Sequence, residues 1–343
     1  MHTVPSALAT GAAAVHGVTR DQLRGPRWRS PAHGVHERCE YPLDLRARCL
    51  ALQLVLADSA VFTHLTAGRL QGLWLPSALP AAWATSVPAS LIASVPTSRH
   101  TAVSHQDRRG VYVRRCAVPA EHRREVLGVR VASTPWTLVE LAEDLTLVDL
   151  VVAMDSALQL GRSSRRALES AEVRGRRGAR TYRQALMLAD GRSESAWETV
   201  LRLVHVLGGI VDIEPQHQLR TEDGEPCARG DLWLRGTRRW AEYDGSVHRD
   251  PAVHRRDLRR DKLLARIGWE RYGYTAPEIH REPHQILADA ETALGLPHDP
   301  QRVEGWLVEY RRSSLSRPGA ARLARRLARF ERPAPRPRSA HPA

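Results

Sequence analysis

Residues 226–245 read PCARGDLWLRGTRRWAEYDG, and they give the clearest structural signal in the C-terminal half of the chain. Two runs that end in apolar residues flank an Arg-Gly turn at residues 235–238, which is typical of two antiparallel strands. The preceding residues 210–220 predict another strand, and residues 193–209 predict an amphipathic helix that ends at a glycine pair.

The residues downstream of this stretch continue an alternation of helices and strands. They predict an Arg-rich helix at residues 251–267, a strand at 269–274 and a helix at 277–290. The expected order of the C-terminal region is therefore helix, three strands, helix, strand, helix.

Carboxylates lie close together on the two central strands of this region. Side chains alternate along a strand, so Glu242 and Asp244 project from one face, and a hairpin brings Asp231 beside them. Three carboxylates on one face repel each other unless a cation lies among them, and such oxygen ligands suit Mg2+ or Mn2+. Glu198 on the preceding helix is expected to reach this cluster, and His248 is placed to accept or deliver a proton.

A simpler interpretation of the same carboxylates stays open. Asp231 and Glu242 are followed or preceded closely by Arg235, Arg238 and Arg239, with which they could form ordinary surface ion pairs.

The whole chain is basic. Its 343 residues include 51 Lys and Arg against 38 Asp and Glu, a formal charge of +13, and Lys262 is the only lysine. Excess positive charge favours an acidic partner, and nucleic acid is favoured over membrane because no stretch approaches the roughly 20 uninterrupted apolar residues of a spanning helix. Alternatively, the arginines reflect composition alone.

The first 40 residues predict a helix-turn-helix followed by a hairpin. A small-residue helix is expected to run to about Val15, with a turn at Gly17 and a second helix capped by Thr19. In a winged helix-turn-helix the second helix reads DNA, and its exposed polar residues would be Arg20, Gln22 and Arg24. The alternative is a small helical cap that uses arginine for solubility.

The middle of the chain predicts a mixed α+β region. A helix is expected at residues 45–56, short strands at 90–95, 110–116 and 129–132, and two packed helices from Thr134 to about Leu160. His64 is interpreted as a helix-start residue with a hydrogen-bonded ring and not as a metal ligand. Residues 171–192 predict a basic helical linker.

Cysteine spacing and the first residues bear on the compartment. The four cysteines are too scattered for a CxxC pair or a zinc site, and the Ala-rich first fifteen residues lack the basic start of a signal peptide. We therefore expect a reduced, cytoplasmic protein.

Five separated pieces between residues 193 and 286 carry a family resemblance. They are the helix ESAWETVLR, the strand around Gln216, GDLWL, EYDGSVH and RRDKLLARIGW. Together they resemble an uncharacterised bacterial family related to very-short-patch-repair endonucleases, within the PD-(D/E)XK superfamily. In the N-terminal half GVTRDQLRG, WRSPAHGVH and FTHLTAGRLQGL resemble AbiEi-type antitoxins.

The nuclease resemblance implies residue roles. Asp231 and Glu242 would hold Mg2+ or Mn2+ with Glu198 as a further ligand, and Asp244 or His248 would orient the attacking water. The superfamily has Lys where this chain has Asp244, so a second metal, His248 or an arginine must replace that Lys, or the site does not cleave. Backbone contacts to DNA are expected from arginines after this segment: Arg249, Arg255, Arg256 and Arg259.

The sequence thus predicts an α/β multidomain protein. Its expected parts are a winged helix-turn-helix at 1–45, an α+β AbiEi-like domain at 46–170, the linker at 171–192, an endonuclease-like αβββαβα core at 193–290 and a basic extension with a disordered tail at 291–343. The predicted function is Mg2+-dependent hydrolysis of DNA. The alternatives are a non-catalytic DNA-binding or antitoxin-like regulator with a toxin-like or defence-system partner, and a protein that binds only protein partners.

Overall fold

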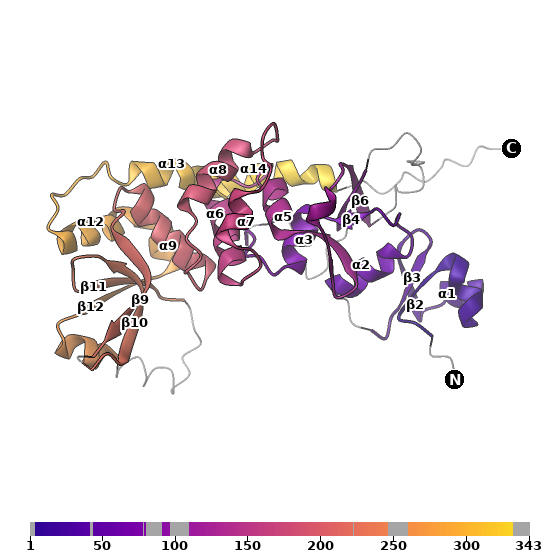
Figure 1. The fold of residues 1–343 in the computed structure, drawn as a ribbon, viewed down its shortest axis with the longest axis horizontal. Coiled ribbons are helices and arrows are strands. Elements are labelled where there is room, and N and C mark those ends of the chain that lie inside the picture. Colours follow the sequence, from indigo (N-terminus) through magenta and orange to yellow (C-terminus); the bar gives the residue numbers. More distant parts are fainter. Residues whose placement is uncertain are drawn as a thin grey trace.

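The computed structural model describes residues 4–41, 44–77, 79, 91–96, 110–221, 223–245 and 260–331. Within these residues three β-sheets follow one another along an elongated molecule, and a group of helices separates the second sheet from the third (Figure 1). The N-terminal sheet lies at one end and the four-stranded C-terminal sheet at the other. The predicted mixed α/β class is confirmed.

The N-terminal sheet contains the predicted hairpin and one strand that was not predicted. The hairpin strands β2 (Trp28–Ala32) and β3 (Val35–Arg38) are antiparallel, and β1 (Ala7–Ala9) pairs with the other edge of β3. Strand β1 forms because its single buried residue, Leu8, packs into a small core while its backbone completes the hydrogen bonding of β3.

The two N-terminal helices differ from each other in type. The second predicted helix is confirmed as α1 (Arg20–Arg24), a single five-residue segment capped by Thr19. The first is not an α-helix: β1 is followed by the 3-10 helix η1 (Thr10–His16), which ends at Gly17 with φ 69°. Its Ala and Gly residues bury only Ala13, too little apolar surface to stabilise a full amphipathic helix.

A five-stranded sheet organises the middle region, in the order β6-β5-β4-β8-β7. Strands β4 and β8 are parallel, as are β5 and β6, and the other pairs are antiparallel. The strands are β4 (Val61–Phe62), β5 (Leu91–Val95), β6 (Val111–Arg115), β7 (Arg123–Val126) and β8 (Val129–Ala132).

Helices cover this sheet and lead away from it. The helices are α2 (Leu45–Gln53), α3 (His64–Leu70), α5 (Thr134–Leu141) and α6 (Leu147–Gln159), and η3 (Ala120–His122) precedes β7. Helix α5 begins as predicted, because the Ser133 side chain accepts from the Trp136 N–H and proline occupies the first turn. The two packed helices predicted up to Leu160 are therefore confirmed as α5 and α6.

The predicted basic connector is packed against the middle region. Helices α7 (Arg165–Glu169) and α8 (Ala179–Leu188) follow α6, and Tyr182 and Ala185 of α8 belong to the main core. The Tyr182 hydroxyl donates to the Leu168 carbonyl over 2.9 Å. The segment is helical, as predicted, and it holds to its neighbours through apolar contacts.

The C-terminal region has the predicted order of elements. Helix α9 (Ala196–Leu207) precedes β9 (Ile213–Arg220), β10 (Pro226–Leu234) and β11 (Arg239–Tyr243). A helix at 260–266, then β12 (Glu270–Tyr274), α11 (Ala276–Arg281) and α12 (Pro283–Leu294) complete it. The sheet order is β12-β11-β10-β9, with β11 and β12 parallel. That this arrangement is a restriction-endonuclease core stays a prediction.

The residues after 300 return along the molecule. Helix α13 (Glu304–Arg312) packs against α9 and α6. Helix α14 (Arg317–Leu327) continues from it toward the middle region (Figure 1), and η4 (Ala328–Phe330) follows. Trp306, Leu323 and Phe330 are buried in the same core as Leu65 of the middle region. The expected basic helix is thus amphipathic and packed, and the tail at 332–343 lies outside the described residues.

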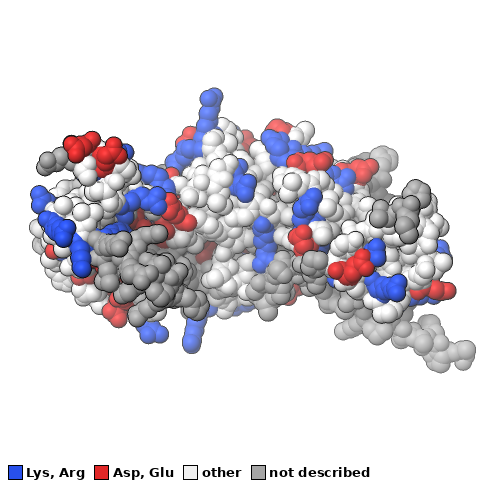
Figure 2. All heavy atoms as spheres, turned by 90° about the horizontal axis from the view of Figure 1, so that it is seen from below, with Lys and Arg blue, Asp and Glu red and all other residues white. Residues whose placement is uncertain are grey.

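Charge is spread over the surface. On the face in Figure 2, basic side chains occur along the whole length with acidic side chains between them, so the described residues of that face form no single basic stripe. No helix in the described part of the chain is long and apolar enough to span a membrane.

Candidate functional site

Helix α1 presents the three residues that the sequence predicted for DNA contact. Arg20, Gln22 and Arg24 are all exposed, whereas Leu23 between them is 4% exposed and anchors the helix in the N-terminal core. Arg24 and Asp21 are 3.5 Å apart, but both side chains are almost fully exposed, so this ion pair holds Arg24 only weakly.

Gln22 also has a structural role in capping α1. The side-chain Oε1 of Gln22 accepts a hydrogen bond from the Thr19 backbone N–H at 2.8 Å, and the backbone N–H of Gln22 donates to Thr19 Oγ1 at 3.2 Å. These two bonds form a capping box that fixes the start of α1. The side-chain oxygen of Gln22 is therefore engaged in capping, and its side-chain NH2 group is the part that can donate to a ligand.

The C-terminal sheet brings two of the predicted carboxylates together. Asp231 lies on β10 and Glu198 at the start of α9, where Ser195 caps the helix through the Glu198 N–H. The Tyr243 N–H donates to Asp231 Oδ2 at 2.9 Å. Burial raises the pKa of Asp231 to about 6, and the negative charge of Glu198 adds to this effect. Asp231 is therefore a carboxyl that can hold or release a proton near neutral pH.

Glu242 is engaged by two arginines and not by other carboxylates. It is 4% exposed on β11; Arg260 donates to its Oε1, and Arg271 Nε donates to its Oε2 at 2.6 Å. Arg271 also bonds Asp244 at 2.5 Å, and Arg260 donates to the Arg229 carbonyl at 2.6 Å. The charge of Glu242 is thus balanced by guanidinium groups.

This arrangement bears on the predicted metal ion. No three potential ligands converge on one point anywhere in the described residues, and both oxygens of Glu242 face arginine. With both of its oxygens held by arginine, Glu242 would have to exchange these bonds to bind a cation together with Asp231 and Glu198. Metal binding stays a prediction.

Several predicted residues lie outside the described part of the chain. They are His248, Arg249, Arg255, Arg256 and Arg259. Their predicted roles in proton transfer and in DNA backbone contact stay predictions.

Two site residues received no role from the sequence. Arg271 reaches Glu242 because β12 lies parallel to β11, and the sequence signal was only a basic residue on the strand that follows the carboxylates. Gln216 on β9 donates to Glu198 Oε2 at 2.8 Å and has a positive φ of 53°, which is strained for a residue with a side chain. No sequence signal indicates that strain.

A second ionic cluster lies in the middle region. His64 is fully buried with φ 55°; its N–H donates to Glu140 Oε2 at 3.1 Å, and its Nε2 lies 2.9 Å from Asp144 Oδ2. The other ring nitrogen has no partner among the described residues, so the predicted hydrogen-bonded ring is confirmed on one side only. From the C-terminal segment, Arg329 binds Asp144 through two hydrogen bonds.

Comparison with known proteins identifies a likeness in the middle region. Residues 57–190 match the family described as the AbiEi antitoxin C-terminal domain, which supports the predicted antitoxin-like region. The uncharacterised proteins MT2308 and Rv2248 of two Mycobacterium tuberculosis strains are each 36% identical to the chain over 163 residues. The matched part covers 46% of this chain and 60% of each relative, and no solved structure matches. Over residues 57–190 the chain is thus similar to an antitoxin domain.

Proposed function

We propose that this chain is a DNA-binding regulator of the antitoxin type, in which α1 and the β2–β3 hairpin contact DNA. The observation that carries the proposal is the exposed, capped helix with Arg20, Gln22 and Arg24, in one chain with residues 57–190 that are similar to an antitoxin domain. The cytoplasm is the compartment that fits such a regulator.

In the proposed DNA binding, some side chains of the N-terminal module would contact phosphates and others would contact bases. Arginine binds phosphate oxygens through two parallel N–H groups, which supplies affinity that depends on salt. An amide or a guanidinium that reaches a base edge in the major groove supplies sequence preference. Arg20, Arg24 and Gln22 offer both kinds of group within one helix turn and a half.

The contacts in the C-terminal sheet favour binding over cleavage. Arg260 and Arg271 already neutralise Glu242, and the residue at the usual lysine position is Asp244, which itself pairs with Arg271. A carboxylate in such a pair is a poor ligand for a divalent cation, because the metal would have to displace charged hydrogen bonds.

The direct test is binding of the full chain to duplex DNA from the region around its own gene, followed by fluorescence anisotropy. We expect the variant Arg20→Gln/Arg24→Gln to bind at least tenfold more weakly, because each phosphate contact contributes to affinity. Arg183→Gln is the control. Arg183 is exposed on α8, far from the N-terminal module, and its replacement also removes an arginine charge from the surface. Equal affinity of all three proteins would refute a role for α1.

A toxin-like or defence-system protein is the protein partner that we propose. The support is the antitoxin description of the family matched by residues 57–190. Co-expression with the product of an adjacent gene should relieve growth inhibition by that product. Growth that stays inhibited when the full chain is co-expressed would contradict the proposal.

Metal-dependent DNA cleavage is the second candidate. What favours it is the partly buried Asp231 carboxyl on β10: burial, and after it the negative charge of Glu198, raises its pKa to about 6. Supercoiled plasmid incubated with protein and Mg2+ or Mn2+ tests it against Asp231→Ala/Glu242→Ala. An intact plasmid with both proteins would reject this candidate.

A further inference from the structure

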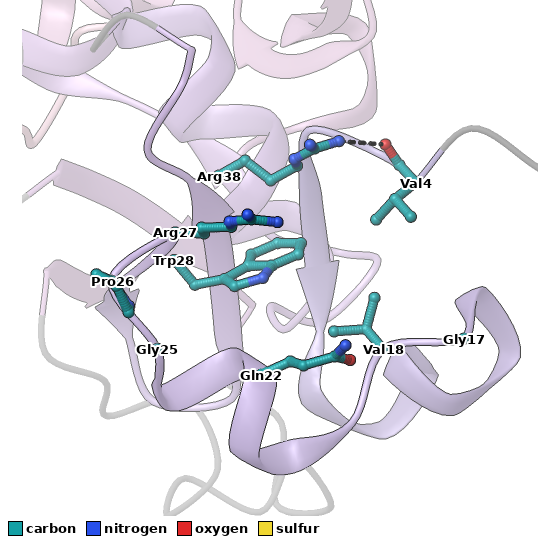
Figure 3. A pocket seen from close by; sticks show the side chains of 9 residues that line it. All are labelled: Val4, Gly17, Val18, Gln22, Gly25, Pro26, Arg27, Trp28 and Arg38. Atoms are coloured by element: carbon teal, nitrogen blue, oxygen red, sulfur yellow. Dashed lines mark hydrogen bonds between the residues drawn. The ribbon is translucent and has the colours of Figure 1, made fainter.

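A pocket lies in the N-terminal module, between α1 and the hairpin (Figure 3). Its cavity volume is about 400 Å3. Sites for small molecules commonly span about 300–1,000 Å3, so the pocket has the size of a small organic ligand. None of the site residues in the C-terminal sheet belongs to it.

One wall of the pocket is apolar and aromatic. Trp28 is half-buried, and Val18 and Val4 line the pocket with it. In Figure 3 the Trp28 ring lies between Gln22 and Val18 on one side and Arg27 on the other, with Arg38 beyond Arg27. A planar ring that stacks on the indole face would remove apolar surface from water on both partners.

Two arginines give the pocket a positive side. Arg27 is exposed, and none of the hydrogen bonds or ion pairs found among the described residues uses its guanidinium. Arg38 is held in place, because it donates to the Val4 carbonyl at 3.4 Å and pairs with Glu40 at 2.8 Å. Arg27 is therefore the group available for an anion, and a guanidinium suits a phosphate through two N–H groups.

Gln22 adds a directional polar group to the same pocket. The side-chain oxygen of Gln22 already accepts from the Thr19 N–H, so the side chain presents mainly its two N–H donors to the pocket. A ligand edge with acceptors fits this group. Guanine presents two such acceptors, N7 and O6, next to each other.

We propose that this pocket binds a mononucleotide, with the base on Trp28, the base edge at Gln22 and the phosphate at Arg27. Only a ligand that combines a planar ring, an acceptor edge and an anionic group uses all three features. Inorganic phosphate leaves the indole uncovered, and an uncharged ring leaves Arg27 without a partner. A base within a duplex must first leave the stack, at a cost of a few kcal/mol, so the free nucleotide is the occupant.

Binding of the nucleotide changes what α1 presents to DNA. Gln22 lies both in the pocket and on the exposed surface of α1, so one amide cannot serve a bound nucleotide and a DNA base together. The nucleotide therefore competes with any DNA contact that Gln22 makes.

The experiment is isothermal titration calorimetry of the full chain, without DNA, against guanosine monophosphate, guanosine and inorganic phosphate. We expect the nucleotide to bind at least tenfold more tightly than either part alone. No DNA is present, so the result does not depend on whether the chain binds DNA. Absence of nucleotide binding up to millimolar concentration, or phosphate binding as tight as nucleotide binding, would overturn the proposal.

Two variants assign the binding to this pocket. Gln22→Glu keeps the capping box, because glutamate accepts from the Thr19 N–H in the same way, but it removes the donor and adds a negative charge. Arg27→Gln removes the phosphate partner. Each should weaken nucleotide binding at least tenfold with an unchanged melting temperature, whereas the control Arg183→Gln should bind like wild type. Unchanged affinity in both Gln22→Glu and Arg27→Gln would refute the site. Loss of binding in Trp28→Leu would not rescue it, because that variant can lose binding by unfolding.

Discussion

Asp231 is a partly buried carboxyl whose ionisation opposes folding. Burial, together with the charge of Glu198, raises its pKa to about 6, whereas an unfolded aspartate has a pKa of about 3.9. Between about pH 4 and pH 6 the folded protein therefore holds a proton that the unfolded chain has released. The contribution of this group to stability falls as the pH rises through that window.

The variant Asp231→Asn should be more stable than wild type at pH 7.5, because asparagine never carries the buried charge. We expect a gain of about 1–3 kcal/mol in the free energy of unfolding, and a loss of this gain at pH 4. Urea denaturation at both pH values measures it. The exposed Asp212, replaced by Asn, serves as a control with an effect below about 0.5 kcal/mol. A gain of the same size at both pH values would contradict the assignment.

Gly178 marks a place where the backbone leaves no room for a side chain. Its φ is +77°, and an added Cβ would lie 2.0 Å from the Ala142 carbonyl oxygen. Gly224 has a similar φ of +83° with no described atom within 4 Å of that position. We expect Gly178→Ala to cost about 3 kcal/mol or more and Gly224→Ala only about 1–2 kcal/mol, the cost of the left-handed conformation alone. Equal losses in thermal denaturation would refute the close approach.

At the scale of elements, α14 and η4 fasten the end of the described chain to the middle region. Arg329 binds Asp144 through hydrogen bonds of 2.6 and 2.7 Å, and the Phe330 ring lies 4.9 Å from that of His64. Although burial opposes ionisation, the bonds from His64 and Arg329 lower the pKa of Asp144 to about 2. This carboxylate stabilises the fold above about pH 4, and the stabilisation is lost as the pH falls toward 2.

Arg329→Gln should therefore destabilise the protein at pH 7. Because the Arg329 side chain is 36% exposed, we expect a loss of only about 1–2 kcal/mol, which shrinks as Asp144 becomes protonated. Arg325→Gln, an exposed neighbour on α14, is the matched control. If both variants unfolded at the same urea concentration as wild type, the ion pair would contribute nothing to the docking of α14.

The elements show what the sequence pattern can predict. The alternation in β10 and β11 and the capped start of α5 were sufficient to predict those elements, because both signals are local. Strand β1 was missed because it exists only through pairing with β3, about 28 residues away by register. The burial of α14 was also missed, because a basic amphipathic helix and a free basic helix share much of the same composition.

At the scale of the molecule, the sequence predicted one of the two candidate sites better than the other. The exposure of Arg20, Gln22 and Arg24 follows from their place on a short capped helix, and the sequence predicted it. For Glu242 the sequence offered the neighbouring arginines Arg235, Arg238 and Arg239 as partners. The arginines that bind it are Arg260 and Arg271, which approach from other elements and across 18 and 29 residues. The sequence identified the carboxylates but not the groups that pair with them.

One core joins the middle and C-terminal regions, so these two regions form one support for the N-terminal module that we propose contacts DNA. Leu65, Ile286 and Phe330 belong to this core, and Arg202 of α9 pairs with Asp155 of α6 at 2.8 Å. The N-terminal module has a small core of its own, around Leu8 and Leu23. The proposed DNA contact thus lies at one end of an elongated body (Figure 1).

Contact between α1 and DNA would show itself in the salt dependence of binding. We expect log K for a duplex containing the bound site to fall linearly with log salt between about 50 and 200 mM, and the slope to decrease by about two for Arg20→Gln/Arg24→Gln, since each lost phosphate contact removes about 0.9. A slope equal to that of wild type in this variant would show that neither arginine of α1 contacts a phosphate.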